Sequence, residues 1–318
     1  MPLPAFKESF SGQVNEITLG GGTRKTTVTV GGARNVPFGG DRAATGQRPV
    51  IAVDVLDVPP DDWPPVLAEA YGDVLGDPAA WARMAVDQVG ADLVCLKFDG
   101  IHPDKGDRGA DHAVAVTRKV LEAVGVPLIL WGCGNDEKDN AVMPKVSEAA
   151  KGEKVLLGTV TEENYKNLAA VTLADGHFLI AEAPLDINIA KQVNFLVSDM
   201  GVPLERMVMF QTTGSLGYGM EYAYSIQERE RLAALGGDKL MAMPVICDVG
   251  YESWRAKEAK TPTQDAPQWG DAARRGPVWE AVTAIALLQS GIDIIRMRSP
   301  EAVATVKRYV GQVWGGQA

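Results

Sequence analysis

Polar side chains that could bind a ligand follow eight short apolar runs in this 318-residue sequence. The carboxyl ends of parallel strands meet at one end of a barrel, so residues at these positions could share a site. The set combines carboxylates, cations, amides and hydroxyls, which suits a large polar ligand. Its members are Asp54, Asp57, Lys97, Asp99, 132–135, Gly158, Thr159, Glu182, Asp186, Asn188, 211–213, Asp248, Tyr251, Arg296 and Arg298.

Several catalytic chemistries fit this set poorly. Nucleophilic hydrolysis needs a Ser or Cys beside a His, and of His102, His112 and His177 the last precedes a strand, at the wrong end. A zinc site needs clustered His and Cys, and neither Cys-x-x-Cys nor His-x-x-x-His occurs. A four-iron cluster needs four thiolates, and the chain has three cysteines. The sequence therefore predicts a binding surface without a complete catalytic set.

The remaining charged and sulfur-containing positions favour structural roles. Cys95, Cys133 and Cys247 lie in or just after three different runs, which favours packing over metal ligation. Lys97 and Asp99 are expected to form a buried ion pair. We expect Arg296 and Arg298 to pair with neighbouring carboxylates in the same way.

Two further motifs leave a ligand role open. The segment 214–219 is glycine-rich and precedes a helix, but it lacks the lysine of a nucleotide-binding loop. It is either a tight turn or a place where backbone approaches a bulky ligand. Asp186 is an obvious helix N-cap, whereas Asn188, one turn further on, could offer its amide to a ligand.

The eight apolar runs alternate with helix-like stretches, which is the pattern of a (β/α)8 TIM barrel. A helix that begins at Asp77 and Pro78 is expected to end at Gly90, and another to end before Gly125. A doubly wound open sheet is the rival, but eight similar units without a break in composition favour closure. The predicted strands are 50–53, 93–96, 128–131, 155–157, 178–181, 207–210, 245–247 and 292–295.

The first 48 residues differ from the rest and are predicted to form an extension before a barrel of residues 49–318. Within them, 17–19 and 26–30 are β-prone and separated by glycines, which predicts an antiparallel hairpin. That hairpin could cap the bottom of the barrel or face a partner. The segment 250–276 is predicted to be a long loop, which usually serves a site or an interface.

Composition excludes several classes of protein. The chain has 41 acidic and 31 basic residues, a net charge of −10, which opposes binding to nucleic acid or anionic lipid. No apolar run approaches the roughly 20 residues of a membrane span. Residues 1–7 lack the apolar core of a secretory signal, and three scattered cysteines suit reduced thiols. These features predict a cytoplasmic protein of ordinary composition.

Four longer motifs carry a resemblance to a known family. They are 184–189, 211–222, 237–259 and 279–284. Together they resemble the small subunit of the corrinoid iron–sulfur protein, also called the delta subunit of the CO dehydrogenase/acetyl-CoA synthase complex. The resemblance extends from the 21–24 turn almost to the C-terminus.

The resemblance implies a TIM barrel that pairs with a large subunit in a heterodimer. That corrinoid iron–sulfur protein large subunit carries a four-iron four-sulfur cluster and a mobile corrinoid-binding domain. The barrel would cover a cobalamin-type corrinoid, whose cobalt performs the chemistry. The assembly would receive a methyl group from methyltetrahydrofolate through a methyltransferase. It would then deliver that group to acetyl-CoA synthase/CO dehydrogenase, in the reductive acetyl-CoA pathway.

The resemblance also implies which positions face the corrinoid. They are Asp186, Asn188, Thr212, Thr213, Gly214, Leu216, Gly217, Tyr218, Gly219, Asp248 and Tyr251. Members of the family usually have Asp where this chain has Gln211, and the neutral amide keeps hydrogen bonding but removes a charge.

Two alternatives stay open. The chain could be a catalytic pterin-binding methyltetrahydrofolate:corrinoid methyltransferase, since barrels of this type also resemble dihydropteroate synthase. It could also be a purely structural subunit whose barrel never touches a cofactor. Binding of methyltetrahydrofolate by the isolated chain would favour the first alternative.

Overall fold

The computed structural model describes residues 9–37 and 45–315, and its centre is a closed barrel of eight parallel strands. The strand order around the barrel is β10-β3-β4-β5-β6-β7-β8-β9. The predicted TIM barrel is therefore confirmed, and the open sheet is excluded. The strands are β3 (Val50–Leu56), β4 (Leu93–Lys97), β5 (Leu128–Trp131), β6 (Leu156–Val160), β7 (Phe178–Ala183), β8 (Met207–Gln211), β9 (Val245–Cys247) and β10 (Ile294–Met297).

Both faces of each barrel strand are covered, which explains why the apolar runs in the sequence are nearly continuous. All seven residues of β3 are buried. One set of side chains, including Ala52 and Ile129, fills the barrel interior. The alternate set, including Val53 and Leu130, packs against the surrounding helices. Burial on both sides excludes an edge strand and holds the register.

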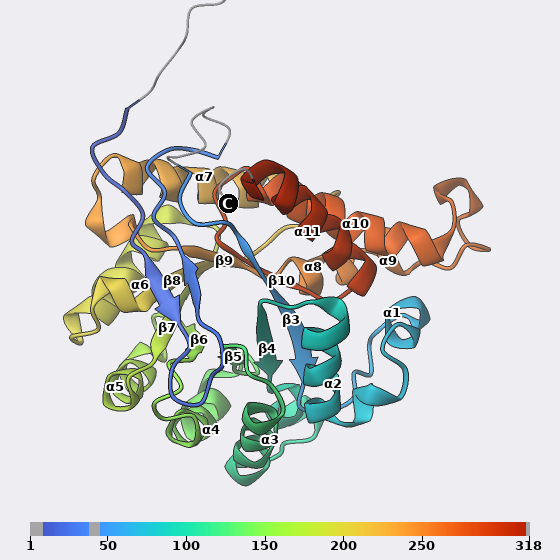
Figure 1. The fold of residues 1–318 in the computed structure, drawn as a ribbon, viewed down its shortest axis with the longest axis horizontal. Coiled ribbons are helices and arrows are strands. Elements are labelled where there is room, and N and C mark those ends of the chain that lie inside the picture. The colour runs from blue at the N-terminus through green and yellow to red at the C-terminus, as the bar shows by residue number, and fades with distance from the viewer. Residues whose placement is uncertain (1–8, 38–44, 316–318) are drawn as a thin grey trace, which may run out of the picture.

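Helices follow the strands and form the outer ring (Figure 1). Their capping follows the sequence signals: Asp77 accepts from the N–H of Ala79, and Gly90 ends its helical segment in the left-handed region. The helices are α1 (Pro65–Glu69), α2 (Pro78–Met84), α3 (Ala110–Ala123), α4 (Asp136–Ala149), α5 (Tyr165–Asp175), α6 (Ile187–Asp199), α7 (Met220–Leu235), α8 (Val249–Arg255), α9 (Lys257–Lys260), α10 (Ala272–Leu288) and α11 (Pro300–Trp314).

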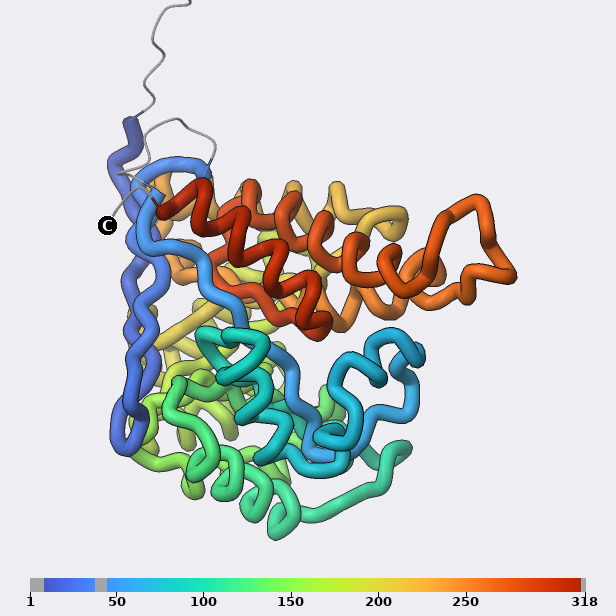
Figure 2. The backbone as a smooth tube through the Cα atoms, turned by 45° about the vertical axis from the view of Figure 1, so that its right-hand side comes forward, coloured from blue at the N-terminus to red at the C-terminus, as the bar shows by residue number. Residues whose placement is uncertain are grey.

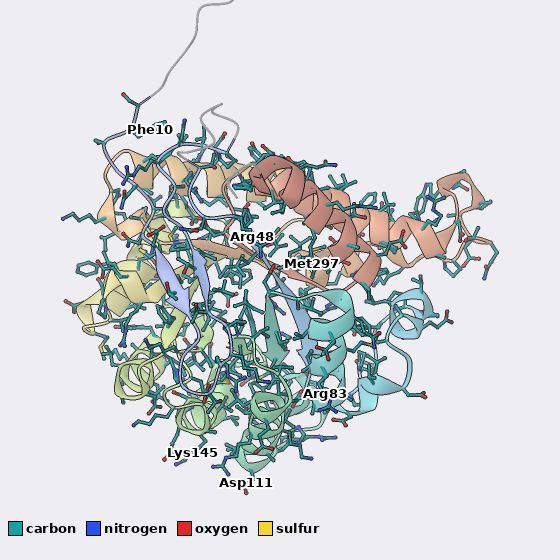
Figure 3. The ribbon with its side chains drawn as sticks, viewed as in Figure 1. Phe10, Arg48, Arg83, Asp111, Lys145 and Met297 are labelled. Carbon is teal, nitrogen blue, oxygen red and sulfur yellow. The ribbon has the colours of Figure 1, made fainter. Side chains whose placement is uncertain are left out.

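Short 3-10 segments and one π-helical segment complete the connections. The π-helical segment, η3 (Ala85–Val89), continues α2. The 3-10 segments are η2 (Gly72–Gly76), η4 (Asp99–Ile101), η5 (Pro103–Lys105), η6 (Leu204–Arg206), η7 (Lys239–Met241) and η8 (Pro267–Trp269). Figure 3 shows Asp111 and Lys145 projecting outward from α3 and α4, while Met297 lies in the body of the barrel.

The N-terminal hairpin closes the bottom of the barrel. Strands β1 (Ile17–Leu19) and β2 (Val28–Val30) pair antiparallel, and Ile17, Leu19 and Val30 join the interior cluster at the amino ends of the barrel strands. Figure 2 shows this hairpin along one end of the molecule and the segment around residue 265 projecting at the other. Of the two roles predicted for the hairpin, the structure confirms the cap.

Side chains of the turn between β1 and β2 attach the hairpin firmly to the outer ring. The Arg24 guanidinium pairs with Glu153 at 2.8 Å and donates to the carbonyls of Leu121 and Val124, at 2.6 Å each. The N–H of Thr23 also donates to Glu153. Residues 1–8 and 38–44 of the predicted extension, including the opening segment 1–7, lie outside the described residues.

The prediction of a long loop at 250–276 was wrong. Helix α8 starts two residues after β9, α9 follows after one residue, and α10 begins at Ala272, inside the segment predicted as a loop. Apolar side chains explain this helical order, because Trp254 and Ala259 are buried against the rest of the barrel.

The ends of the strands also differ from the prediction. Strand β3 runs three residues further than predicted, which places Asp54 inside the barrel and not after it. Among the described residues, none of the helices is long and apolar enough to cross a membrane.

Candidate functional site

The predicted cofactor-facing residues gather on one sector of the mouth, the end of the barrel where the strands have their carboxyl ends. They follow β7, β8 and β9, which are neighbours in the barrel. Asp186, Asn188, Thr212, Gly217 and Tyr218 are exposed, whereas Leu216 and Tyr251 are half-buried. Thr213 and Asp248 are buried. The structure therefore brings the predicted set together on one surface about three strands wide.

An ion-pair network occupies the centre of the mouth. Asp54 accepts from Arg296 Nε at 3.0 Å, from Arg296 Nη2 at 3.2 Å and from Arg298 Nε at 3.1 Å. Burial alone would raise the pKa of Asp54, but the two guanidinium charges hold it below its usual value. The predicted pairing of both arginines with carboxylates is confirmed.

Aromatic rings hold these cations in place. The Arg296 guanidinium lies 3.9 Å from the centre of the Trp131 ring, and Trp131 meets Phe210 edge-on with centroids 5.0 Å apart. Arg296 is one of the largest fully buried side chains among the described residues. Charged and aromatic side chains thus fill the centre of the mouth.

Tyr251 is surrounded by three cations. Lys97, Arg255 and Arg298 lie 5.6, 5.1 and 5.3 Å from the centre of its ring. Each cation also has a carboxylate partner: Lys97 pairs with Asp99 at 3.6 Å, as predicted, and Arg255 pairs with Glu252 at 3.1 Å. Tyr251 is therefore half-buried within a set of neutralised charges.

Several carboxyl groups at the mouth resist ionisation. Burial raises the pKa of Glu182, of Asp248 and of Glu252. Asp248 Oδ1 is buried and has no hydrogen-bonding partner among the described residues. A ligand at the mouth could therefore form a hydrogen bond with Asp248 Oδ1, which would accept if the carboxyl is ionised and could donate if it is protonated.

The backbone geometry of the glycine-rich loop 214–219 explains most of its glycines. A Cβ at Gly214 would lie 2.9 Å from the carbonyl oxygen of Gly219, so the loop closes on itself there. Gly217 and Gly219 have φ of +82° and +99°, which side chains rarely adopt. A Cβ at Gly217 would otherwise meet only the Trp279 ring at 3.6 Å and Glu258 at 3.9 Å. The tight-turn interpretation explains Gly214, while Gly217 leaves open surface above it.

Asp186 caps α6, and its carboxylate accepts from the N–H groups of Asn188 and Ile189 at 2.7 and 3.3 Å. The capping prediction is confirmed, so this carboxylate is already engaged. The amide side chain of Asn188 is exposed beside it. Of this pair, Asn188 is the residue available to a ligand.

A buried pair that was not predicted from the sequence lies beneath the loop. Gln211 ends β8 and Glu230 lies on α7; both are fully buried, and none of their four side-chain polar atoms has a hydrogen-bonding partner of good geometry in the described chain. Burial raises the pKa of Glu230 to about 8, and the facing Gln211 amide partly opposes this shift. The sequence contains only a weak signal for this pair, because Glu230 is one of four consecutive charged residues, 228–231.

The histidines and cysteines make no catalytic arrangement in the described part of the chain. His112 Nε2 lies 3.0 Å from Asp57, and its Nδ1 lies 3.3 Å from Arg108, so both ring nitrogens are engaged. His177 is buried before β7 and bonds the carbonyl of Ser147. Burial raises the pKa of Cys95 to about 12, which fits the packing role predicted for it. The described residues contain no group of three or more His, Cys, Asp or Glu placed to hold a metal ion.

Comparison with known proteins adds a family to this geometry. Residues 16–260 match the family described as CO dehydrogenase/acetyl-CoA synthase delta subunit. The chain belongs to this family. The subunit delta of the acetyl-CoA decarbonylase/synthase complex from Archaeoglobus fulgidus is 38% identical, with 98% of this chain and 72% of that protein aligned. The subunit delta from Methanothermobacter thermautotrophicus is 35% identical, over 96% and 77%.

Solved structures support the fold of this family member. Dihydropteroate synthase from Xanthomonas albilineans superposes with a TM-score of 0.55 at 14% identity, over 87% of this chain and 98% of that enzyme. The Thermus thermophilus dihydropteroate synthase gives the same TM-score at 16% identity, over 95% of this chain and all of the enzyme. At such identities the likeness establishes a common barrel and nothing about the ligand.

Proposed function

We propose that this chain is the small subunit of a methyl carrier in the acetyl-CoA decarbonylase/synthase complex, and that its barrel mouth covers a cobalt corrinoid shared with a large subunit. The observation that carries the proposal is membership of the delta family over residues 16–260. The relatives are named as subunits of that complex.

The charge arrangement at the mouth supports a covering role. Asp54, Arg296 and Arg298 neutralise one another, and Arg296 is held against Trp131. A charged group that is already paired and stacked is poorly placed to move protons during a reaction. A filled mouth suits a flat ligand that lies across it better than a small ligand that enters it.

The β7–β9 sector suits the periphery of a corrin ring, which carries several amide groups. Asn188 and Thr212 are exposed hydrogen-bonding side chains, and Asp248 Oδ1 is an unpartnered polar atom among the described residues. Gly217 leaves clearance at the same surface. Donors, acceptors and clearance in one sector are what an amide-bearing macrocycle requires.

When bound, the cobalt would supply the nucleophile and carry the methyl group. The residues of this chain would orient the ring through Asn188 and Thr212, exclude water with Tyr251 and Tyr218, and keep Asp248 close to a peripheral amide. In this proposal the large subunit carries a four-iron four-sulfur cluster, and the complex is located in the cytoplasm. The carrier receives the methyl group from a methyltetrahydrofolate:corrinoid methyltransferase and delivers it to acetyl-CoA synthase/CO dehydrogenase.

Copurification tests the proposal. A protein preparation that retains native partners should contain this chain and a large subunit at about 1:1, with cobalt, iron and a corrinoid absorption spectrum. Asn188→Trp and Thr212→Trp should each lower the corrinoid content at least several-fold. Ala115→Trp, on the exposed side of α3, is the matched control and should leave it unchanged.

The two alternatives give different results in the same experiment. Unchanged corrinoid content in both tryptophan variants would support a purely structural subunit. Binding of methyltetrahydrofolate by the isolated chain would support a pterin-binding methyltransferase, although Arg296 and Trp131 fill the centre of the mouth.

A further inference from the structure

The large exposed hydrophobic side chains of the described residues all come from the second half of the barrel. All nine among the described residues fall between 185 and 282, and the first half of the barrel contributes none. Scattered exposed apolar residues are normal on a protein surface, but their restriction to one half of the barrel indicates a contact surface. This half includes the β7–β9 sector of the mouth.

Four of these residues and the neighbouring Trp279 form one patch where α7 and α10 meet, which we call the aromatic patch: Tyr218, Tyr222, Val278, Trp279 and Val282. The Trp279 ring lies beside Gly217, and the Tyr222 ring beside Gly219, so the glycine-rich loop joins the two helices. Val278 and Val282 are one turn apart on α10 and are 51% and 44% exposed. Tyr222 is 67% exposed.

The aromatic patch continues directly into the mouth. The Tyr218 hydroxyl accepts from the N–H of Lys257, which fixes the ring between the loop and α9. A partner that covers the mouth at 212–219 would therefore also meet Tyr222 and α10. Tyr and Trp are the residue types that contribute most at protein interfaces.

Charge around the patch defines the chemistry of the partner. Residues 255–275 hold five basic and three acidic residues, in a chain whose net charge is −10. Lys257, Lys260 and Arg274 are exposed, whereas Arg255 is already paired with Glu252. A basic border around an apolar centre fits a surface with apolar residues flanked by carboxylates.

We infer that the aromatic patch and its basic border form the docking surface for another subunit of the acetyl-CoA decarbonylase/synthase complex, one that presents apolar residues among carboxylates. This inference rests on the proposed function for the identity of the complex. It goes beyond that function because the contact extends from the mouth onto α7 and α10 and does not require the corrinoid.

Site-specific crosslinking in the assembled complex tests the surface directly. A photoreactive p-benzoylphenylalanine at position 222 should form a covalent product whose peptides, by mass spectrometry, belong to a different subunit of the complex. The same group at position 119, on exposed α3, should give little product. Products only between two copies of this chain, or equal products at 222 and 119, would overturn the inference.

Affinity measurements provide the second test. Tyr222→Asp combined with Val278→Asp should weaken association with the purified subunit that crosslinking identifies, at least tenfold. Both side chains are exposed, and the new negative charges would face carboxylates of that subunit. Ala115→Asp, equally exposed on α3, should not change the affinity. Wild-type association should weaken as salt rises, and Arg274→Glu should reduce that salt dependence. Unchanged affinity in the double variant at an unchanged melting temperature would overturn the inference.

The corrinoid spectrum separates this inference from the proposed function. If position 222 crosslinks to a complex that contains no corrinoid, the docking surface stands and the proposed function fails. If corrinoid copurifies but the double variant binds normally, the proposed function stands and the docking surface fails.

Discussion

Glu230 is fully buried on α7 and faces the amide of Gln211, yet neither group makes a hydrogen bond of good geometry within the described residues. A protonated carboxyl and a primary amide can form two mutual hydrogen bonds, O–H to amide oxygen and N–H to carboxyl oxygen. An ionised carboxylate would instead repel the amide oxygen. A proton on Glu230 is therefore the simplest way to satisfy this pair, in line with the raised pKa of about 8.

Glu230→Gln tests this account through the pH dependence of stability. A Glu in the unfolded chain ionises near pH 4.5, whereas folded Glu230 keeps its proton to about pH 8. The folded chain thus binds more protons between these values, so stability falls as pH rises across them, by up to about 1.4 kcal/mol per pH unit. Urea unfolding at several pH values should show a smaller decline for the variant. An identical decline in both proteins would contradict the protonated pair.

Asp54 supports a second prediction at the level of single residues. Asp54→Asn keeps the shape of the side chain but leaves Arg296 and Arg298 buried without their counter-charge. Loss of one partner from a buried ion pair costs about 3–5 kcal/mol. Denaturant unfolding should detect this loss, and Asp265→Asn, at an exposed position, should change stability by less than about 0.5 kcal/mol.

At the level of elements, helices α8 and α10 are joined by Trp254 and Glu280. The buried Glu280 carboxylate accepts from the indole N–H of Trp254 at 2.6 Å and from the N–H groups of Arg298 and Ser299 at 2.6 and 3.0 Å. Burial outweighs these bonds and raises the pKa of Glu280 to about 7. Glu280 thus links two outer helices to the end of β10, where Arg298 enters the mouth.

Gly276 determines how closely these two helices approach. A Cβ at Gly276 would lie 2.5 Å from the Trp254 ring, so Gly276→Ala should destabilise the protein by about 1–3 kcal/mol through overpacking. Gly311, inside α11, has open space around its Cβ position, and Gly311→Ala should stabilise by roughly 0.5–1 kcal/mol. Thermal unfolding of both variants measures the two effects, and a stabilised Gly276→Ala variant would contradict the close packing.

At the level of the whole molecule, the barrel is closed at the bottom by the hairpin and filled at the mouth by charged and aromatic side chains. Leu19 is fully buried in the interior cluster, while Thr18 on the same strand faces out. Leu19→Ala should therefore cost about 2–5 kcal/mol. Thr18→Ala should change stability by less than about 0.5 kcal/mol, and equal effects of the two substitutions in urea unfolding would show that the hairpin does not seal the barrel.

The sequence was sufficient to predict the barrel because burial on both sides of each strand leaves a continuous apolar run. It was also sufficient for the cap at Asp186 and for the pairing of Lys97 with Asp99. It did not predict α8 and α9, because both helices are short and only three of their buried residues, Val249, Trp254 and Ala259, carry an apolar side chain. The Glu230–Gln211 pair was missed for a different reason: its two members are brought together only by the packing of α7 on β8.

The hairpin has a consequence for how the chain reaches its native state. Its apolar residues contact the amino ends of barrel strands from Val50 to Ile294, so its binding surface is complete only after the last strand has joined. The hairpin leaves the ribosome before any barrel strand, yet it is expected to dock late. Until then, the floor of the immature barrel stays open to other apolar segments, and a slow barrel-closing step would lengthen that period of exposure.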